Sequence, residues 1–170
     1  VCGARQLRVL VITGPAGSGK STLAKWGLAE AERTAAMEGL AAGYDLSGGG
    51  MTGGLQNVLH RLLDDPFASS EPEVEPWGWL GDGEAAFDVD HARQWMAADR
   101  GVASMADLEL LRDVLLTASR RRPLYLWLDD VGWSRDGAFD LVEMLLARGD
   151  APILAVLTLR SGTAGHPWVA

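Results

Sequence analysis

Cysteine and long apolar runs are both scarce in this chain of 170 residues. The single cysteine, Cys2, can form no internal disulfide, and no cysteine or histidine beside it completes a zinc site. No apolar run approaches the roughly 20 residues that a membrane-spanning helix needs. Residues 1–6 lack the charged-then-apolar order of a signal peptide. The composition therefore predicts a soluble, cytoplasmic protein without a membrane partner.

Positive charge is scarce as well. The 15 lysine and arginine residues stand against 23 aspartate and glutamate residues, and the net charge is -8. This balance argues against a domain that grips a nucleic-acid backbone, although one local electropositive pocket could still hold a nucleotide. The three histidines, at 60, 91 and 166, have no metal-like spacing.

The length and composition suit one domain. With 48% hydrophobic and 22% charged residues, the chain has enough apolar side chains for a real core. It opens on Val1 and stops at Ala170 without a helix stop or a polar tail. We therefore expect residues 1–170 to form a single domain that is a fragment of a longer protein.

Two kinds of apolar pattern alternate along the chain. Short apolar runs predict buried strands at 8–13, 124–130 and 152–159, and a weaker pattern predicts one at 40–46. Helical spacing predicts helices over 21–37, 55–63, 89–98, 106–120 and 136–148. This alternation predicts an α/β fold of three layers, a parallel sheet with helices on both faces. In such sheets, ligands bind at the carboxyl ends of the strands.

Residues 64–90 differ in kind from the rest. They hold three prolines, several glycines and nine acidic residues, with no lysine or arginine. This composition predicts a poorly ordered acidic insertion outside the core. A partner-binding loop and a plain solvated excursion both fit it.

A phosphate-binding motif follows the first strand run. Residues 14–21 read GPAGSGKS and match GxxxxGK[ST] in full. Glycines let backbone N–H groups turn toward phosphate oxygens, and the next helix points its positive end at them. Lys20 adds a full charge, and Ser21 offers a hydroxyl to Mg²⁺. We therefore predict that the following residues bind the nucleotide: Gly14, Pro15, Ala16, Gly17, Ser18, Gly19, Lys20, Ser21 and Thr22.

A phosphate loop needs a carboxylate for its metal, held at the end of a neighbouring strand. The run LYLWLDD over 124–130 supplies two. We expect Asp129 to help bind Mg²⁺ and Asp130 to orient or polarise the attacking water. The structural alternative is a solvent-facing turn in which Asp130 caps a helix.

The strand run at 152–159 is followed by Arg160, at the same edge of the sheet. Its guanidinium is suited to reading the γ-phosphate and reporting whether ATP or ADP is bound. A surface arginine at a strand end is the alternative. The guanine motif of GTPases, Asn-Lys-x-Asp, does not occur in the chain, which favours ATP over GTP.

Three stretches carry a family resemblance: GPAGSGKST, LYLWLDDVGWSRDGAFDLVEMLL and PILAVLTLR. They resemble the nucleotide-binding core of the signal-transduction ATPases with numerous domains, the STAND class of P-loop proteins. More closely, they resemble the AAA-type modules of large bacterial regulators, whose second motif also reads Asp-Asp-Val-x-Trp, and the NB-ARC modules.

The resemblance implies a sheet in which the sensor strand separates the Walker A and Walker B strands, and a helical lid that the chain ends before. It also implies roles for single residues: Walker A for Lys20 and Ser21, Walker B for Asp129 and Asp130, sensor for Arg160, and packing for Trp133.

The leading interpretation is a slow, Mg²⁺-dependent ATPase that acts as a switch in a multidomain signalling protein. We expect a homo-oligomer, contacts with other domains of the same chain, and no direct nucleic-acid contact. The main alternative is a nucleotide-binding oligomerisation module with negligible hydrolysis. A small-molecule P-loop kinase fits less well, because residues 131–152 lack the clustered arginines of a kinase lid and offer only Arg135 and Arg148.

Overall fold

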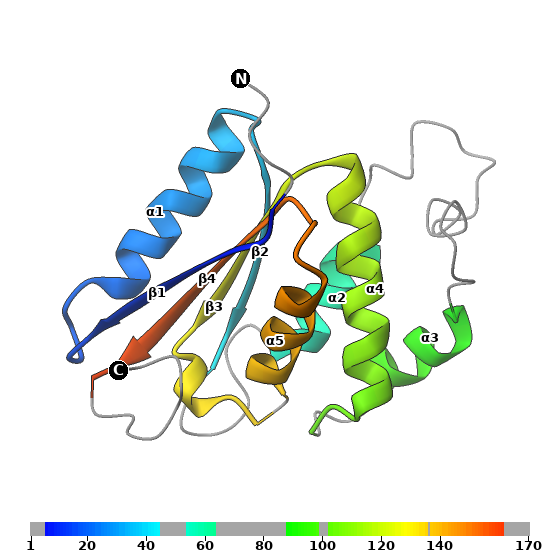
Figure 1. The fold of residues 1–170 in the computed structure, drawn as a ribbon. Coiled ribbons are helices and arrows are strands. Elements are labelled where there is room, and N and C mark those ends of the chain that lie inside the picture. Colours follow the sequence, from blue (N-terminus) through cyan, green and yellow to red (C-terminus); the bar gives the residue numbers. More distant parts are fainter. Residues whose placement is uncertain (1–5, 45–53, 64–87, 99–101, 136, 162–170) are drawn as a thin grey trace.

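The computed structural model describes residues 6–44, 54–63, 88–98, 102–135 and 137–161. Strands and helices alternate along these residues (Figure 1). The elements are β1 (Arg8–Gly14), α1 (Lys20–Arg33), β2 (Glu38–Gly43), α2 (Gly54–Leu63), α3 (Val89–Ala97), α4 (Met105–Arg121), β3 (Leu124–Asp129), the 3-10 helix η3 (Val131–Trp133), α5 (Ala138–Arg148) and β4 (Ile153–Arg160).

The four strands form one parallel sheet in the order β1-β4-β3-β2. This confirms the predicted α/β fold with a parallel sheet. It also confirms the strand order that the family resemblance implies, because β4 lies between β1 and β3. The carboxyl ends of these three strands therefore meet at one edge of the sheet, where parallel sheets bind ligands.

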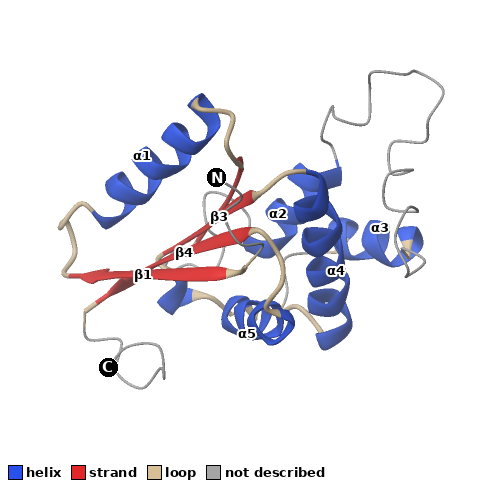
Figure 2. Ribbon diagram, turned by 45° about the horizontal axis from the view of Figure 1, so that its top comes forward, coloured by secondary structure: helices blue, strands red, loops and turns tan. Residues whose placement is uncertain are grey.

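Helices cover both faces of the sheet, with α1 on one face and α2, α4 and α5 on the other (Figures 1 and 2). Alternation along β3 explains the two faces. Leu124, Leu126 and Leu128 are buried in the larger core. Tyr125 and Trp127 instead belong to a smaller cluster with residues of α1. The three-layer architecture is thus built into the strand sequence.

Helix α1 packs closely on β3 because a glycine lies at the contact. The Tyr125 hydroxyl donates a hydrogen bond of 3.0 Å to the backbone carbonyl oxygen of Ala24. A Cβ atom on Gly27 would lie only 2.8 Å from the same hydroxyl. Burial raises the pKa of Tyr125, which keeps the phenol protonated as a donor. This contact fixes the distance between α1 and β3.

The junction after α1 differs from the sequence prediction. The helix predicted over 21–37 ends at Arg33, and the strand predicted at 40–46 lies at Glu38–Gly43. The alanine-rich sequence favours a longer helix, but tertiary structure requires a turn that brings β2 alongside β3.

That turn has the geometry of a Schellman cap, with Ala35 in the left-handed conformation at φ 51°. The amide of Ala36 donates to the carbonyl of Ala31 at 3.1 Å, and the amide of Ala35 donates to that of Glu32 at 2.9 Å. Glycine usually occupies such a position, so its absence hid the helix end in the sequence.

The other predicted helix boundaries agree with the structure within two residues, and Ser104 caps the start of α4 in a capping box with Asp107. The last three residues of the stretch expected to be an acidic insertion instead belong to α3, which Asp88 caps and Val89 opens. The rest of that stretch, 64–87, lies outside the described residues. Within the described part of the chain, every helix is too short or too polar to span a bilayer.

Candidate nucleotide-binding site

The loop between β1 and α1 takes its shape from two glycines. Gly17 has a φ of 75° and Gly19, which precedes α1, has a φ of 85°. A side chain at such an angle costs about 1–2 kcal/mol per residue. The amide of Ser18 closes a turn on the carbonyl of Pro15 at 3.3 Å. Glycines are therefore required at 17 and 19 for the chain to turn back into the helix.

The start of α1 is open to an anionic ligand. Gly19 provides no side-chain cap, and the first turn of the helix contains no acidic residue. Residues 15–19 are exposed, so a ligand can approach the loop backbone that leads into the positive end of the helix. A Cβ atom on Gly14 would lie 2.8 Å from Ser18 Oγ, so a side chain here would have to displace the Ser18 hydroxyl.

Lys20 lies under this loop with only 8% of its surface exposed. Its Nζ donates a hydrogen bond of 2.9 Å to the carbonyl oxygen of Pro15. A buried ammonium group with a neutral partner is poorly compensated in charge. The loop therefore holds one positive charge in the place where the sequence motif predicts phosphate.

Ser21 reaches the end of β3 across 108 residues of sequence. Its Oγ donates to Asp129 Oδ1 at 2.7 Å, so a hydroxyl and a carboxylate lie side by side. These hard oxygen donors fit Mg²⁺, which is usually bound through one or two carboxylates with water and substrate phosphates. Among the described residues, no group of three His, Cys, Asp or Glu side chains could hold a metal ion without ligands from water or phosphate.

Thr158 of β4 is a site residue that the sequence analysis missed. Its hydroxyl is fully buried, donates to Asp129 Oδ1 at 2.5 Å and accepts from the Asp130 amide at 2.8 Å. The signal in the sequence was a single polar residue inside the apolar run ILAVLTL. A buried hydroxyl needs a partner, and the end of the neighbouring strand supplies it.

Asp130 pairs with Arg160. The Nε and Nη2 atoms of Arg160 both donate to Asp130 Oδ2, at 3.1 and 2.8 Å. This hydrogen bonding raises the pKa of Arg160 and keeps the guanidinium charged. Asp130 does precede the helix η3, in the left-handed conformation at φ 51°, but its side chain makes no capping bond. The capping alternative is therefore wrong in its main point, because this carboxylate is held by an arginine.

Trp133 was expected to serve packing, yet 38% of its surface is exposed. Arg160 Cζ lies 6.0 Å from the centre of its ring, within reach of a cation–π contact. Trp133 thus supports the guanidinium of Arg160 from outside the core.

The structure divides the predicted site residues into two groups. Ser21 and Asp129 meet directly, and Lys20 lies next to Ser21 at the start of α1. Asp130 and Arg160 meet at the ends of β3 and β4. The final residue of the predicted set, Thr22, is exposed in the first turn of α1.

A family model described as AAA ATPase domain matches residues 1–157. The chain belongs to this family. Comparisons with curated proteins and with solved structures gave no match. AAA ATPase domains bind nucleotide, in agreement with the open loop, the buried Lys20 and the Ser21–Asp129 contact. The match to the AAA domain ends one residue before Thr158, so the roles of Thr158 and Arg160 are argued from geometry.

Proposed function

We propose that this AAA domain binds ATP with Mg²⁺ and hydrolyses it slowly to ADP and phosphate. The observation that carries the proposal is the 2.7 Å hydrogen bond between Ser21 Oγ and Asp129 Oδ1. It joins the phosphate-loop motif to the end of β3, beside a helix start that no side chain closes. Hydroxyl, carboxylate and buried ammonium are the groups that phosphoryl transfer requires.

Binding would use the loop and its lysine. The N–H groups of the exposed residues Ala16, Gly17 and Gly19 would donate to phosphate oxygens. Lys20 Nζ would exchange its bond to the Pro15 carbonyl for one to phosphate. Ser21 and Asp129 would hold Mg²⁺, which neutralises charge on the β- and γ-phosphates when bound. The loop thereby fixes the phosphates relative to the end of β3.

Hydrolysis would use Asp130. Its carboxylate would take a proton from water as the water oxygen attacks the γ-phosphorus, and the bond to the bridging oxygen would break to leave ADP. Arg160 now occupies Oδ2 of Asp130. A γ-phosphate would compete for this guanidinium, so that the Asp130–Arg160 pair would respond to ATP and not to ADP.

The resemblance to STAND modules is the support for placing this ATPase as a switch in a multidomain signalling protein. On the same ground we propose homo-oligomers, contacts with other domains of the chain, a cytoplasmic location and no direct nucleic-acid contact. A second candidate function is a nucleotide-binding module with negligible hydrolysis. The Arg160 contact favours this candidate, because it engages Asp130 in the free protein.

Single-turnover hydrolysis of radiolabelled ATP by the full-length protein separates the two candidates. We expect Mg²⁺-dependent phosphate release, and we expect Asp130→Asn to slow it about 100-fold with nucleotide affinity nearly unchanged. Asp140→Asn, an exposed change on α5, is the matched control. Tight binding without phosphate release would favour the second candidate, and absence of nucleotide binding would overturn both.

A further inference from the structure

We infer that Thr158 is a positioning residue of this site, whose buried hydroxyl fixes the direction of the Asp129 carboxylate. The inference rests on the proposed function, since it names the group that sets the geometry of the proposed metal site. It starts from the place of Thr158 in the sheet.

Thr158 lies where the sheet opens between β3 and β4. Its backbone is still in register with Ile12 of β1, whereas the ladder between β3 and β4 ends at the pair Leu128 and Leu157. Beyond that pair, the strands are joined by the side chain of Thr158, which bonds to both Asp129 and Asp130. Strand β4 thus holds the end of β3 through the Thr158 hydroxyl.

The direction of the Thr158 hydroxyl proton follows from its two partners. The Asp130 amide can only donate, so Thr158 Oγ1 accepts from it at 2.8 Å. The hydroxyl proton is then available for the carboxylate oxygen Asp129 Oδ1. Thr158 is fully buried, so no bulk water competes for either bond. The amide therefore fixes Thr158 as a donor to Asp129.

The two oxygens of Asp129 are treated differently. Oδ1 accepts hydrogen bonds from Ser21 and from Thr158. Oδ2 has no hydrogen-bond donor among the residues that the structure describes. The Ser21 hydroxyl is also proposed to bind Mg²⁺. If Ser21 turns away from Asp129 on nucleotide binding, Thr158 still holds Oδ1 and leaves Oδ2 for the metal.

Valine tests this role because it has nearly the shape of threonine without the hydroxyl. In Thr158→Val, the Asp130 amide and Asp129 Oδ1 both lose a buried partner, whereas Thr158→Ser keeps the hydroxyl. Thr13→Val is the matched control, since Thr13 is an exposed threonine on the adjacent strand β1. If Thr158 served packing alone, Thr158→Ser would change both readouts below more than Thr158→Val. If its hydroxyl positions Asp129, only Thr158→Val changes them.

The first readout uses the protein without nucleotide. We expect the Asp130 amide to exchange with deuterium at least about 10-fold faster in Thr158→Val, because its acceptor is gone. Wild type, Thr158→Ser and Thr13→Val should protect this amide equally. Unchanged protection in Thr158→Val would overturn the inference whether or not the protein binds nucleotide.

The second readout is the gain in ATP affinity that Mg²⁺ brings, measured by calorimetry with the metal and with a chelator. We expect Thr158→Val to reduce this gain about 10-fold, as is typical when an outer-shell partner of a metal site is lost. Affinity without metal should stay within about twofold, and serine should restore the gain. An undiminished gain in Thr158→Val would overturn the inference and leave the proposed function intact. A wild type that binds no nucleotide would instead overturn the proposed function.

Discussion

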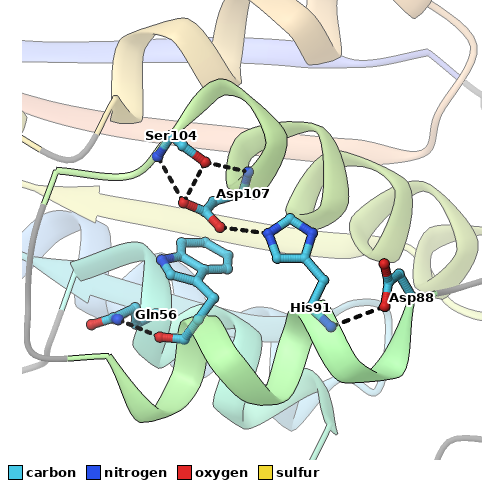
Figure 3. A network of polar contacts seen from close by, with 6 residues as sticks. Gln56, Asp88, His91, Ser104 and Asp107 are labelled. Atoms are coloured by element: carbon cyan, nitrogen blue, oxygen red, sulfur yellow. Dashed lines mark hydrogen bonds and ion pairs between the residues drawn. The ribbon is translucent and has the colours of Figure 1, made fainter.

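Helix α4 begins with its own side chains closing its amide groups, and helix α1 begins with none. At the start of α4, Ser104 Oγ accepts from the Asp107 amide at 3.2 Å, and Asp107 Oδ2 accepts from the Ser104 amide at 2.7 Å. His91 of α3 contacts the other oxygen of Asp107 at 2.8 Å (Figure 3). At the start of α1, Gly19 offers no cap.

The difference separates a structural helix start from one that a ligand completes. The α4 cap joins residues close in sequence and ties α3 to α4, so its value lies in stability. The open start of α1 forgoes only a few tenths of a kcal/mol, because glycine at this position costs little relative to a capping side chain. It leaves N–H groups and Lys20 for an anion, so its value lies in binding.

The largest expected effect comes from removing the charge at the open start. Lys20→Ala should weaken ATP and ADP binding about 100-fold or more, because a buried charged contact to phosphate is lost. Calorimetric titration measures this. Lys25→Ala removes an exposed lysine from the same helix and should leave the affinity unchanged. Equal affinities of wild type and Lys20→Ala would refute the proposed phosphate contact.

Removing the cap at the start of α4 should lower stability and leave nucleotide affinity unchanged. Asp107→Ala should lower the free energy of unfolding by about 1–2 kcal/mol, because the amide of Ser104 before α4 and the His91 ring lose their acceptor. Urea unfolding measures the loss. ATP affinity should not change, and an effect on affinity larger than on stability would break the contrast between the two helix starts.

A third change tests whether the strand ends beside the open start distinguish ATP from ADP. Arg160→Ala should reduce the preference for ATP over ADP about 10-fold, since its guanidinium would no longer reach the γ-phosphate. Competition titrations with both nucleotides measure the ratio. Arg160→Lys keeps the charge but not the two-bond contact to Asp130 and should fall between. A ratio unchanged in Arg160→Ala would assign Arg160 to structure alone.

A smaller effect is expected at the other end of α1. Ala35→Gly should raise the free energy of unfolding by about 0.5–1 kcal/mol, because glycine adopts the left-handed conformation without strain. Thermal unfolding checks the sign. Ala36→Gly, at the next exposed residue, has a negative φ and should not stabilise. A destabilised Ala35→Gly would show that the cap carries no strain.

The smallest effect is a pH dependence of the α4 cap. Burial raises the pKa of Asp107, but the hydrogen bonds from Ser104 and His91 outweigh burial and lower it overall. A lowered carboxyl pKa in the folded state stabilises above the unfolded pKa of about 3.9, and this stabilisation is lost as pH falls through the folded pKa. Wild type should therefore lose more stability in acid than Asp107→Asn, as urea midpoints at several pH values would reveal. Identical losses would contradict the lowered pKa.

The sheet and the two main motifs were predictable because their signals are local. The phosphate loop lies between a strand and a helix in sequence, and Asp129 follows an apolar run directly. Thr158 was missed because its role depends on where the β3–β4 ladder ends, which no local pattern states. The pairing of Asp130 with Arg160 depends on the same register. The end of α1 was misplaced because alanine, a strong helix former, occupies the left-handed position.

The close packing of Tyr125 on Gly27 makes the phosphate loop sensitive to a position that no nucleotide would touch. Gly27 lies about two helical turns along α1 from Ser21, and any side chain there would act as a wedge against the tyrosine ring. The helix would tip and carry Ser21 away from Asp129. The distance between Ser21 and Asp129 thus depends on the packing of Tyr125 against Gly27, at a contact outside the nucleotide site.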